Sequence, residues 1–240
     1  MPARPKLYAL PASHPCETVE EALRLKGLEY DRVDLVPVAH APFQLAVFGK
    51  RTVPAVRFAD GTKVAGSRAI LRELDRIAPE PALLPADPAL RARVEDAERW
   101  GDDVLQPIGR RLAWAAFRRR SDLMTGYADG RLPLPDPAVR AAGPLVAAIA
   151  GRVNGASDEA AAADLAALPG HLDRVDTLIA EGVLDGERAN AADLQIGAGV
   201  RILLTFGDVE PLVAGRPAEA HARRFFPRYA GHVPAGVLPG

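Results

Sequence analysis

A proline-rich segment divides the sequence into two stretches that carry different patterns. Residues 79–88 hold four prolines in ten positions, and such a segment cannot continue a helix, because proline lacks the backbone N–H and collides with the preceding turn. Runs typical of strands occur before this segment, whereas only helical patterns follow it. Segregation of a mixed α/β pattern from an all-helical one predicts two domains. We expect a first domain at residues 1–78, a linker at 79–88 and an all-helical domain at 89–240.

The stretch before the linker alternates strand and helix signals. Short runs with apolar or aromatic residues predict strands at residues 6–10, 30–35, 55–58 and 62–65. The Asp60-Gly61 step between the last two runs predicts a tight hairpin, because glycine supplies the positive φ of the turn. Helical spacing predicts helices at 16–26 and from Ser67 onward. Residues 36–50 have weak periodicity and two prolines, which predicts a loop with one helical turn.

These elements follow one another as βαβ, a loop, a ββ hairpin and a helix. A right-handed crossover through the first helix makes the first two strands parallel. After the linker, helical patterns occupy residues 88–118, 137–153, 158–181, 190–205 and 217–226. Asn190 and Asp193 form a capping-box pattern at the start of the fourth of these. We interpret this box as a folding element worth about 1 kcal/mol.

Composition and charge exclude several classes of function. Lysine and arginine total 30 against 31 acidic residues, so no broad field draws the chain to nucleic acid or an anionic membrane. The single cysteine, Cys16, excludes an internal disulfide and a cysteine-rich zinc site. No histidine pair has metal-ligand spacing, and no phosphate-loop motif occurs. The longest apolar run, at 144–150, is far shorter than the about 20 residues of a membrane span. Because the first residues also lack a signal-peptide pattern, we expect a cytoplasmic protein without a metal, nucleotide, nucleic-acid or membrane partner.

Four short motifs occur in a fixed order along the chain. They are Ser13-His14-Pro15-Cys16, Thr52-Val53-Pro54-Ala55, Gly66-Ser67-Arg68-Ala69-Ile70 and Asn190-Ala191-Ala192-Asp193-Leu194. Together they resemble the glutathione S-transferase family, and the resemblance covers nearly the whole chain. It implies a thioredoxin-like domain that binds glutathione as co-substrate, a helical domain that shapes the pocket for a small hydrophobic electrophile, and a homodimer.

Ser13 stands where glutaredoxin-like relatives carry the first cysteine of a C-x-x-C motif. It directly precedes a predicted helix, whose free N–H groups and dipole favour an anion. A free thiol has a pKa of about 8.5, and lowering it by about two units ionises most of it at neutral pH. We predict that Ser13 stabilises a bound thiolate by hydrogen bonding, the alternative being an ordinary helix cap. Cys16 cannot form a dithiol pair with a serine; we favour an inert core thiol over one activated by the helix.

The resemblance also implies residues that hold glutathione. Val53-Pro54 corresponds to the cis-proline step, which would let the Val53 backbone pair with the cysteinyl unit of the peptide. Ser67, at a helix N-terminus, would bind the γ-glutamyl carboxylate, with Arg68 adding charge nearby unless it is an exposed helix arginine. Relatives usually have an acidic or amide residue where this chain has Gly66, so Gly66 removes a polar anchor.

Basic residues before the cis-proline step are candidates for the other carboxylate of glutathione. His40, Lys50 and Arg51 lie in the region that reaches the glycyl carboxylate in relatives, the alternative being solvated charges. In the second domain, one predicted helix carries Trp100, Trp114 and Phe117 together with Arg110 and Arg111. These side chains face the cleft between the domains; the alternative is that the aromatic residues pack in the core and the arginines point to solvent.

From these residues we predict an enzyme that activates a low-molecular-weight thiol for attack on a small hydrophobic electrophile. Two alternatives stay open. One is a catalytically silent, transferase-like protein that binds ligands or partner proteins, which Gly66 favours. The other is a transferase that uses a thiol other than glutathione.

Overall fold

The computed structural model describes residues 4–239, so residues 1–3 of the predicted first domain and residue 240 lie outside it. Its sheet has four strands in the order β2-β1-β3-β4. They are β1 (Lys6–Ala9), β2 (Asp31–Asp34), β3 (Ala55–Arg57) and β4 (Lys63–Ala65). β1 pairs parallel with β2 and antiparallel with β3, and β3 forms the antiparallel hairpin with β4. The predicted thioredoxin-like arrangement is confirmed.

Helices cover both faces of this sheet. On one face, α1 (His14–Leu25) and α3 (Ser67–Ile77) pack against each other and against the buried strand residues Leu7, Ala9 and Val56. Side chains alternate along a strand, so Tyr8 points to the other face. There it contacts Phe43 and Phe48 of α2 (His40–Phe48), with ring centroids 5.5 and 5.1 Å apart.

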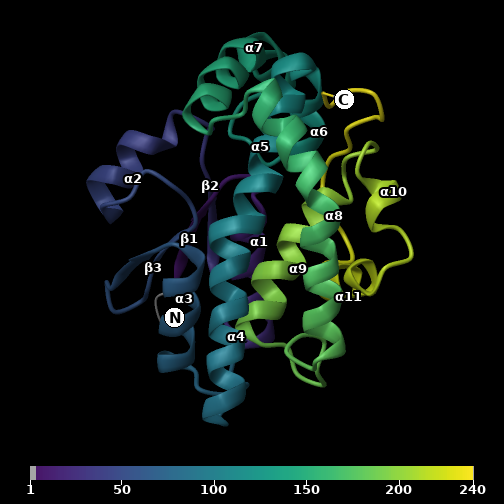
Figure 1. The fold of residues 1–240 in the computed structure, drawn as a ribbon. Helices are drawn as coiled ribbons and strands as arrows, with labels where there is room; N and C mark the ends of the chain where they lie inside the picture. Colours follow the sequence, from purple (N-terminus) through teal and green to yellow (C-terminus); the bar gives the residue numbers. More distant parts are fainter. Residues whose placement is uncertain (1–3, 240) are drawn as a thin grey trace.

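The expected loop at residues 36–50 was wrong, because most of it is the nine-residue helix α2. Its sequence is apolar on several sides, so no single helical face stands out in the pattern. Residues with positive φ bound it, Val38 before the first turn and Gly49 after the last. Gln44 is the buried residue of this helix, whereas Leu45 and Phe43, although the latter contacts Tyr8, stay exposed. Figure 1 shows α2 as a projection at the edge of the molecule.

The chain beyond residue 88 is helical, apart from one isolated bridge between Phe206 and Val233 among the described residues. Its helices are α4 (Pro88–Trp100), α5 (Gln106–Arg119), α6 (Met124–Ala128), α7 (Asp136–Val153), α8 (Asp158–Ala180), α9 (Ala191–Leu203), α10 (Glu210–Val213) and α11 (Pro217–Phe225). A π-helical segment at Gly101–Leu105 joins α4 to α5, and a short 3₁₀ turn spans Ser121–Leu123. The prediction of an all-helical second part is confirmed.

Helix α9 is the centre of this part, and every one of its residues is buried. It packs against α1, α4 and α11 (Figure 1). The predicted capping box is present, because Asn190 accepts from the backbone of Asp193, and Asp193 accepts from that of Asn190. Asp193 also accepts from the backbone N–H of Asp185 and lies 2.9 Å from Nε2 of the buried His221. The box therefore anchors the segment before α9 as well as α11.

The two parts share one apolar core. A continuous cluster of buried side chains extends from the sheet to α11, and Thr18 of α1 donates to the Leu194 carbonyl of α9 at 3.3 Å. The linker is held by the buried Lys26, whose Nζ donates to the carbonyls of Ala78 and Pro81 at 2.6 and 2.9 Å. Because no gap in the core marks a boundary, the division at 79–88 stays a prediction. Within the described residues, no helix is both long and apolar enough to cross a membrane.

Candidate active site

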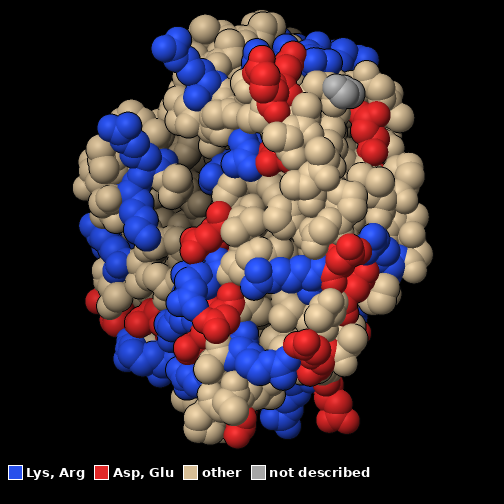
Figure 2. Space-filling model, viewed as in Figure 1, with Lys and Arg blue, Asp and Glu red and all other residues tan. Residues whose placement is uncertain are grey.

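Two adjoining cavities lie where the first sheet meets the helical part. A polar one of about 470 Å³ lies over the N-terminus of α3, and an apolar one of about 320 Å³ lies between the first turn of α1 and helices α5 to α7. Both are lined by Pro15, Thr52, Val53, Gln106 and Arg110. Figure 2 shows the surface hollowed beside the part of the molecule that carries α2.

The polar cavity is built around the start of α3. The Val53-Pro54 bond before β3 is cis, and both residues line this cavity. Ser67, the first residue of α3, is only 3% exposed, and no side chain caps the helix. Free N–H groups and the helix dipole therefore make this end a place for an anion.

Gly66 precedes α3 in a conformation that suits glycine, with φ +96°. A Cβ atom on it would lie 3.3 Å from Nζ of Lys50. The ammonium group of Lys50 thus lies next to the position where relatives usually carry an acidic or amide side chain. The space next to Gly66, where the side chain of another residue would lie, is thus bordered by the ammonium group of Lys50.

Arg68 lines the polar cavity while it is tied to the helical part. Its Nε lies 3.4 Å from Oε2 of Glu98, a fully buried carboxylate on α4 that also bonds Arg72. Burial raises the pKa of Glu98, and the two arginines oppose that rise. Arg68 is therefore neither a free cation nor the exposed helix arginine of the alternative interpretation.

Ser13 is the N-cap residue of α1 and lines the apolar cavity. Its side chain makes no cap hydrogen bond to the first turn. The preceding Ala12 has φ +52°, and its carbonyl accepts a hydrogen bond of 2.7 Å from the hydroxyl of Tyr229. The loop that presents Ser13 is thus held by the C-terminal part of the chain, 217 residues away in sequence.

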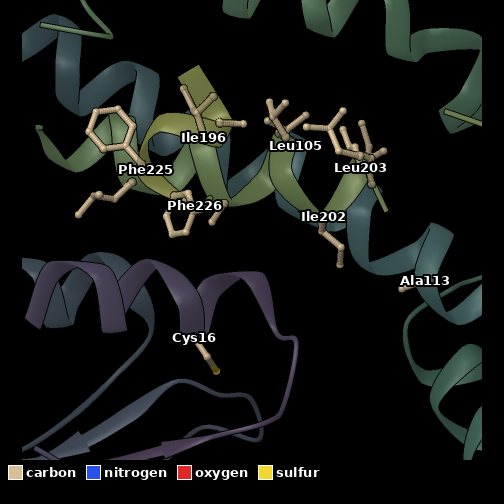
Figure 3. Close-up of a cluster of buried hydrophobic side chains, with 14 of the residues drawn as sticks. Cys16, Leu105, Ala113, Ile196, Ile202, Leu203, Phe225 and Phe226 are labelled. Atoms are coloured by element: carbon tan, nitrogen blue, oxygen red, sulfur yellow. The ribbon is translucent and has the colours of Figure 1, made fainter. Parts of the chain in front are cut away.

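Cys16 is completely buried. Burial raises the pKa of its thiol to about 11, with Ser13 and the Leu10 backbone acting in the opposite direction. Figure 3 shows the side chain pointing from α1 toward the strands. Because a thiol needs its thiolate form to react, this geometry favours the inert interpretation.

His14 connects the start of α1 to the start of α5. Its Nε2 lies 3.0 Å from the carbonyl oxygen of Gln106. Burial first, and the charge of Arg110 second, lower its pKa to about 3, so the ring is neutral at physiological pH and donates to this carbonyl. His14 supports the wall that the two cavities share.

The apolar cavity takes its aromatic wall from α5 and α6. Trp114, Phe117 and Tyr127 follow one another edge to face, with ring centroids 5.5 and 5.0 Å apart. Ile149 and Val153 of α7 line the same space. Side chains from three helices therefore surround a region that suits an apolar ligand.

The structure separates residues that the sequence analysis had grouped. Of the helical residues expected at the cleft, Trp114, Phe117 and Arg110 line the apolar cavity. Trp100 instead packs under Arg174, 4.6 Å from its guanidinium carbon, and Arg111 bonds Asp164 of α8. Of the three basic residues before the cis-proline step, Lys50 lines the polar cavity, whereas His40 and Arg51 line the apolar one.

Two further residues, Asp102 of the π-helical segment and Gln106 at the start of α5, were not singled out from the sequence. Both line the polar cavity, and burial raises the pKa of Asp102. The available signal was the four-residue spacing of Asp102, Gln106 and Arg110, because residues at i and i+4 are neighbours on a helix. Within residues 4–239, no group of three or more His, Cys, Asp or Glu side chains is arranged to hold a metal ion.

Comparison with known proteins agrees with this geometry. Residues 7–82 match the family described as the N-terminal domain of glutathione S-transferases. This part of the chain is therefore similar to the N-terminal domain of glutathione S-transferases, and the four-stranded sheet with its helices agrees with that similarity. The domain contains Ser13, Val53-Pro54 and Ser67, and so nearly all of the first-domain residues considered for the site.

Relatives extend the similarity to the whole fold. Over 93 residues the chain is 36% identical to a maleylacetoacetate isomerase of Pseudomonas aeruginosa, a stretch of 37% of this chain and 44% of that protein. The match thus spans less than half of that relative. The β-etherase LigF of Sphingobium sp. strain SYK-6 superposes over 92% of this chain and 99% of its own, with a TM-score of 0.63 and 21% identity. A glutathione transferase homologue from Sulfitobacter, solved with bound glutathione, covers 93% and 90% with a TM-score of 0.52 and 19% identity. At these identities the two structures share the fold.

Proposed function

We propose that the protein activates glutathione for attack on a small hydrophobic electrophile. The observation that carries the proposal is the meeting of a polar and an apolar cavity along Pro15, Thr52 and Val53, next to Ser13. A reaction between a charged thiol peptide and an apolar acceptor needs both environments side by side. The match to the transferase domain and the glutathione-bound relative support the same assignment.

In this proposal the polar cavity holds the peptide. The N-terminus of α3 with Ser67 receives one carboxylate, and the backbone of Val53 pairs with the cysteinyl unit. Lys50 and Arg68 add positive charge at the same cavity. A helix N-terminus and basic side chains together suit an anionic ligand.

Ser13 then stabilises the thiolate without becoming the nucleophile. Its hydroxyl makes no cap bond, and the neighbouring Cys16 stays protonated because burial raises its pKa to about 11. In this proposal the Ser13 hydroxyl, which makes no cap bond, donates its hydrogen bond to the bound sulfur. In a substitution, the thiolate sulfur forms a bond to the electrophilic carbon, and the leaving group departs with the electrons of its own bond. In an addition, the sulfur bonds to one end of a double bond, and the π electrons move to the other end, which takes up a proton from solvent.

A second candidate is a transferase that uses another thiol, and Lys50 favours it. Its ammonium group lies beside Gly66 at the start of α3, where it would repel the α-ammonium group of glutathione. A thiol that lacks this ammonium group would not meet the repulsion. A catalytically silent binding protein is the remaining alternative. We also propose, from the family resemblance, that the protein is a cytoplasmic homodimer.

A thiol titration tests the proposal. Glutathione and its analogue without the α-amino group are titrated into the protein, and the ultraviolet absorbance of the bound thiolate is followed against pH. We expect saturable binding with a thiol pKa below the free value of about 8.5. Preference for the deaminated analogue would favour the second candidate, and binding of neither thiol would contradict both.

A further inference from the structure

Arg110 lies unpaired at the junction of the two cavities. It lines both of them, and its Nε atom is buried without a hydrogen-bond partner. Within the described residues, its guanidinium takes part in no ion pair. A buried polar donor without a partner costs about 1–3 kcal/mol, and more when it is charged. Such a group at the wall of a cavity is available to bind an anionic ligand.

Other arginines of α5 form ion pairs. Arg111 bonds both oxygens of Asp164, and Arg119 bonds Asp158 at 2.8 Å. Burial lowers the pKa of Arg110, with the charge of Arg111 as a smaller cause and that of Asp102 acting in the opposite direction. Within the described residues, Arg110 thus differs from the other arginines of α5, because Asp102 acts on it only through its charge and not through an ion pair.

The charges around the apolar cavity have one sign. Its lining includes Arg51 and Arg110 but neither aspartate nor glutamate. Asp102, the acid whose charge acts on Arg110, lines the polar cavity instead. The walls opposite are aromatic and aliphatic. This cavity therefore suits a ligand with an apolar body and one negative group.

We propose that Arg110 binds a carboxylate carried by the electrophilic acceptor, so that the substrate class is aromatic or extended apolar electrophiles with an acid group. The planar guanidinium can bond both oxygens of a carboxylate. Trp114 and Phe117 contact the apolar body. The conversion of such an electrophile rests on the proposed function, whereas the binding of a carboxylate to Arg110 does not.

The polar cavity already has cations for the thiol peptide. Lys50 and Arg68 line it together with the N-terminus of α3. The carboxylates of the peptide can therefore be received without Arg110. This leaves its guanidinium for the acceptor, although it borders both spaces.

The test uses a matched pair of acceptors, 4-chloro-3-nitrobenzoate and 4-chloro-3-nitrobenzamide. In both, the thiolate sulfur bonds to the ring carbon that carries chlorine, chloride leaves with the electrons of the C–Cl bond, and the thiol proton goes to solvent. Arg110→Met keeps the length of the side chain and removes its charge. We expect kcat/KM for the benzoate to fall by about 10- to 100-fold, because a charge-assisted hydrogen-bond pair is lost, and that for the benzamide to change less than about 3-fold. Arg119→Met, on the exposed face of α5, serves as the control and should leave the ratio of the two acceptors unchanged.

Equal losses for both acceptors would overturn the inference. If the pKa of the bound thiol also rises in Arg110→Met, the arginine acts on the thiolate instead. Unchanged activity toward both acceptors would equally overturn it.

A binding measurement keeps the inference separate from the proposed function. Calorimetry of 3-nitrobenzoate and 3-nitrobenzamide is carried out on the protein without any thiol. Preference for the benzoate that disappears in Arg110→Met but persists in Arg119→Met supports the inference even if no thiol binds. Equal affinity for the two probes in the wild-type protein contradicts it, whatever the outcome of the thiol titration.

Discussion

The two cavities are built in opposite ways. The polar one combines two short local motifs, the cis bond before β3 and the start of α3, with charged and polar side chains that include Asp102 and Arg110. The apolar one is made by side chains from α5, α6 and α7 that meet across the first turn of α1. The polar cavity therefore depends on charges and a helix N-terminus, whereas the apolar cavity depends on how helices pack. Substitutions in the two cavities should therefore have separable effects.

Acid should loosen the wall that the cavities share, and this is the largest expected effect. His14 has a pKa of about 3 in the fold against 6.5 unfolded, so below pH 6.5 the unfolded chain binds a proton that the native chain does not. The contribution of His14 to the free energy of unfolding is fully present above pH 6.5. It declines toward pH 3 by at most about 1.4 kcal/mol per pH unit. Between pH 7 and pH 5 we expect a loss of about 2 kcal/mol from His14. Urea unfolding of the wild type and His14→Gln at the two pH values measures this. An equally steep decline in the variant would contradict it.

Removing the Ser13 hydroxyl should affect chemistry at the boundary between the cavities. In Ser13→Ala we expect the pKa of the bound thiol to rise by about 1–2 units and conjugation to slow by about 10- to 100-fold. Thiol affinity should change little, because the polar cavity supplies most contacts. The thiolate absorbance against pH is the measurement, with thermal unfolding as the control for folding. Identical titrations of variant and wild type would mean that Ser13 is only a cap.

Ser67→Ala should produce the reverse pattern and so separate the cavities. Loss of one charge-assisted hydrogen bond at the start of α3 is expected to weaken thiol binding by about 10-fold. The rate with saturating thiol should stay near that of the wild type. Calorimetric titration and saturation kinetics give the two numbers. A fall in kcat with unchanged affinity would show that the assignments of Ser13 and Ser67 are exchanged.

Trp114→Ala should change the apolar cavity alone. We expect KM for a hydrophobic acceptor to increase by about 5- to 10-fold, through the loss of buried apolar contact, while thiol affinity stays constant. Steady-state kinetics with each substrate varied in turn checks this. Weaker thiol binding in this variant would show that the two cavities do not act separately.

The smallest effect is expected at the support of the Ser13 loop. Tyr229→Phe removes the hydrogen bond to the Ala12 carbonyl and should lower stability by about 1 kcal/mol. Thermal unfolding measures the stability, and the titration of the bound thiol shows whether the loop still presents Ser13. Conjugation that is unaffected together with unchanged stability would mean that this contact contributes nothing.

Local patterns in the sequence predicted the features that depend on neighbouring residues. The hairpin at Asp60-Gly61, the capping box and the proline-rich linker each place their determinants within a few positions of one another. The same holds for Ser67 at the start of a helix. Such features depend on φ preferences and short hydrogen bonds, and they were sufficient to predict the order of the elements and the family resemblance.

Helix α2 is an element that local sequence patterns did not predict. Its apolar residues form no single buried face: Phe43 and Phe48 contact Tyr8, yet the fully buried residue is the polar Gln44. Periodicity reports a face buried along the whole helix, and this helix does not have one. The expectation of a loop followed from that missing signal.

The sequence by itself determined the order of the strands and the long helices, and which short motifs stand at the helix starts. Only the tertiary structure decided that Arg110 lies unpaired between two cavities while Arg111, one residue further, bonds Asp164. It also decided that Lys50 and Arg51, although adjacent, line different spaces. The reason is physical: a charge is recognised as free or paired only by what other segments bring near it. For α5 those segments are α1, α7, α8 and α9, which lie far away along the chain.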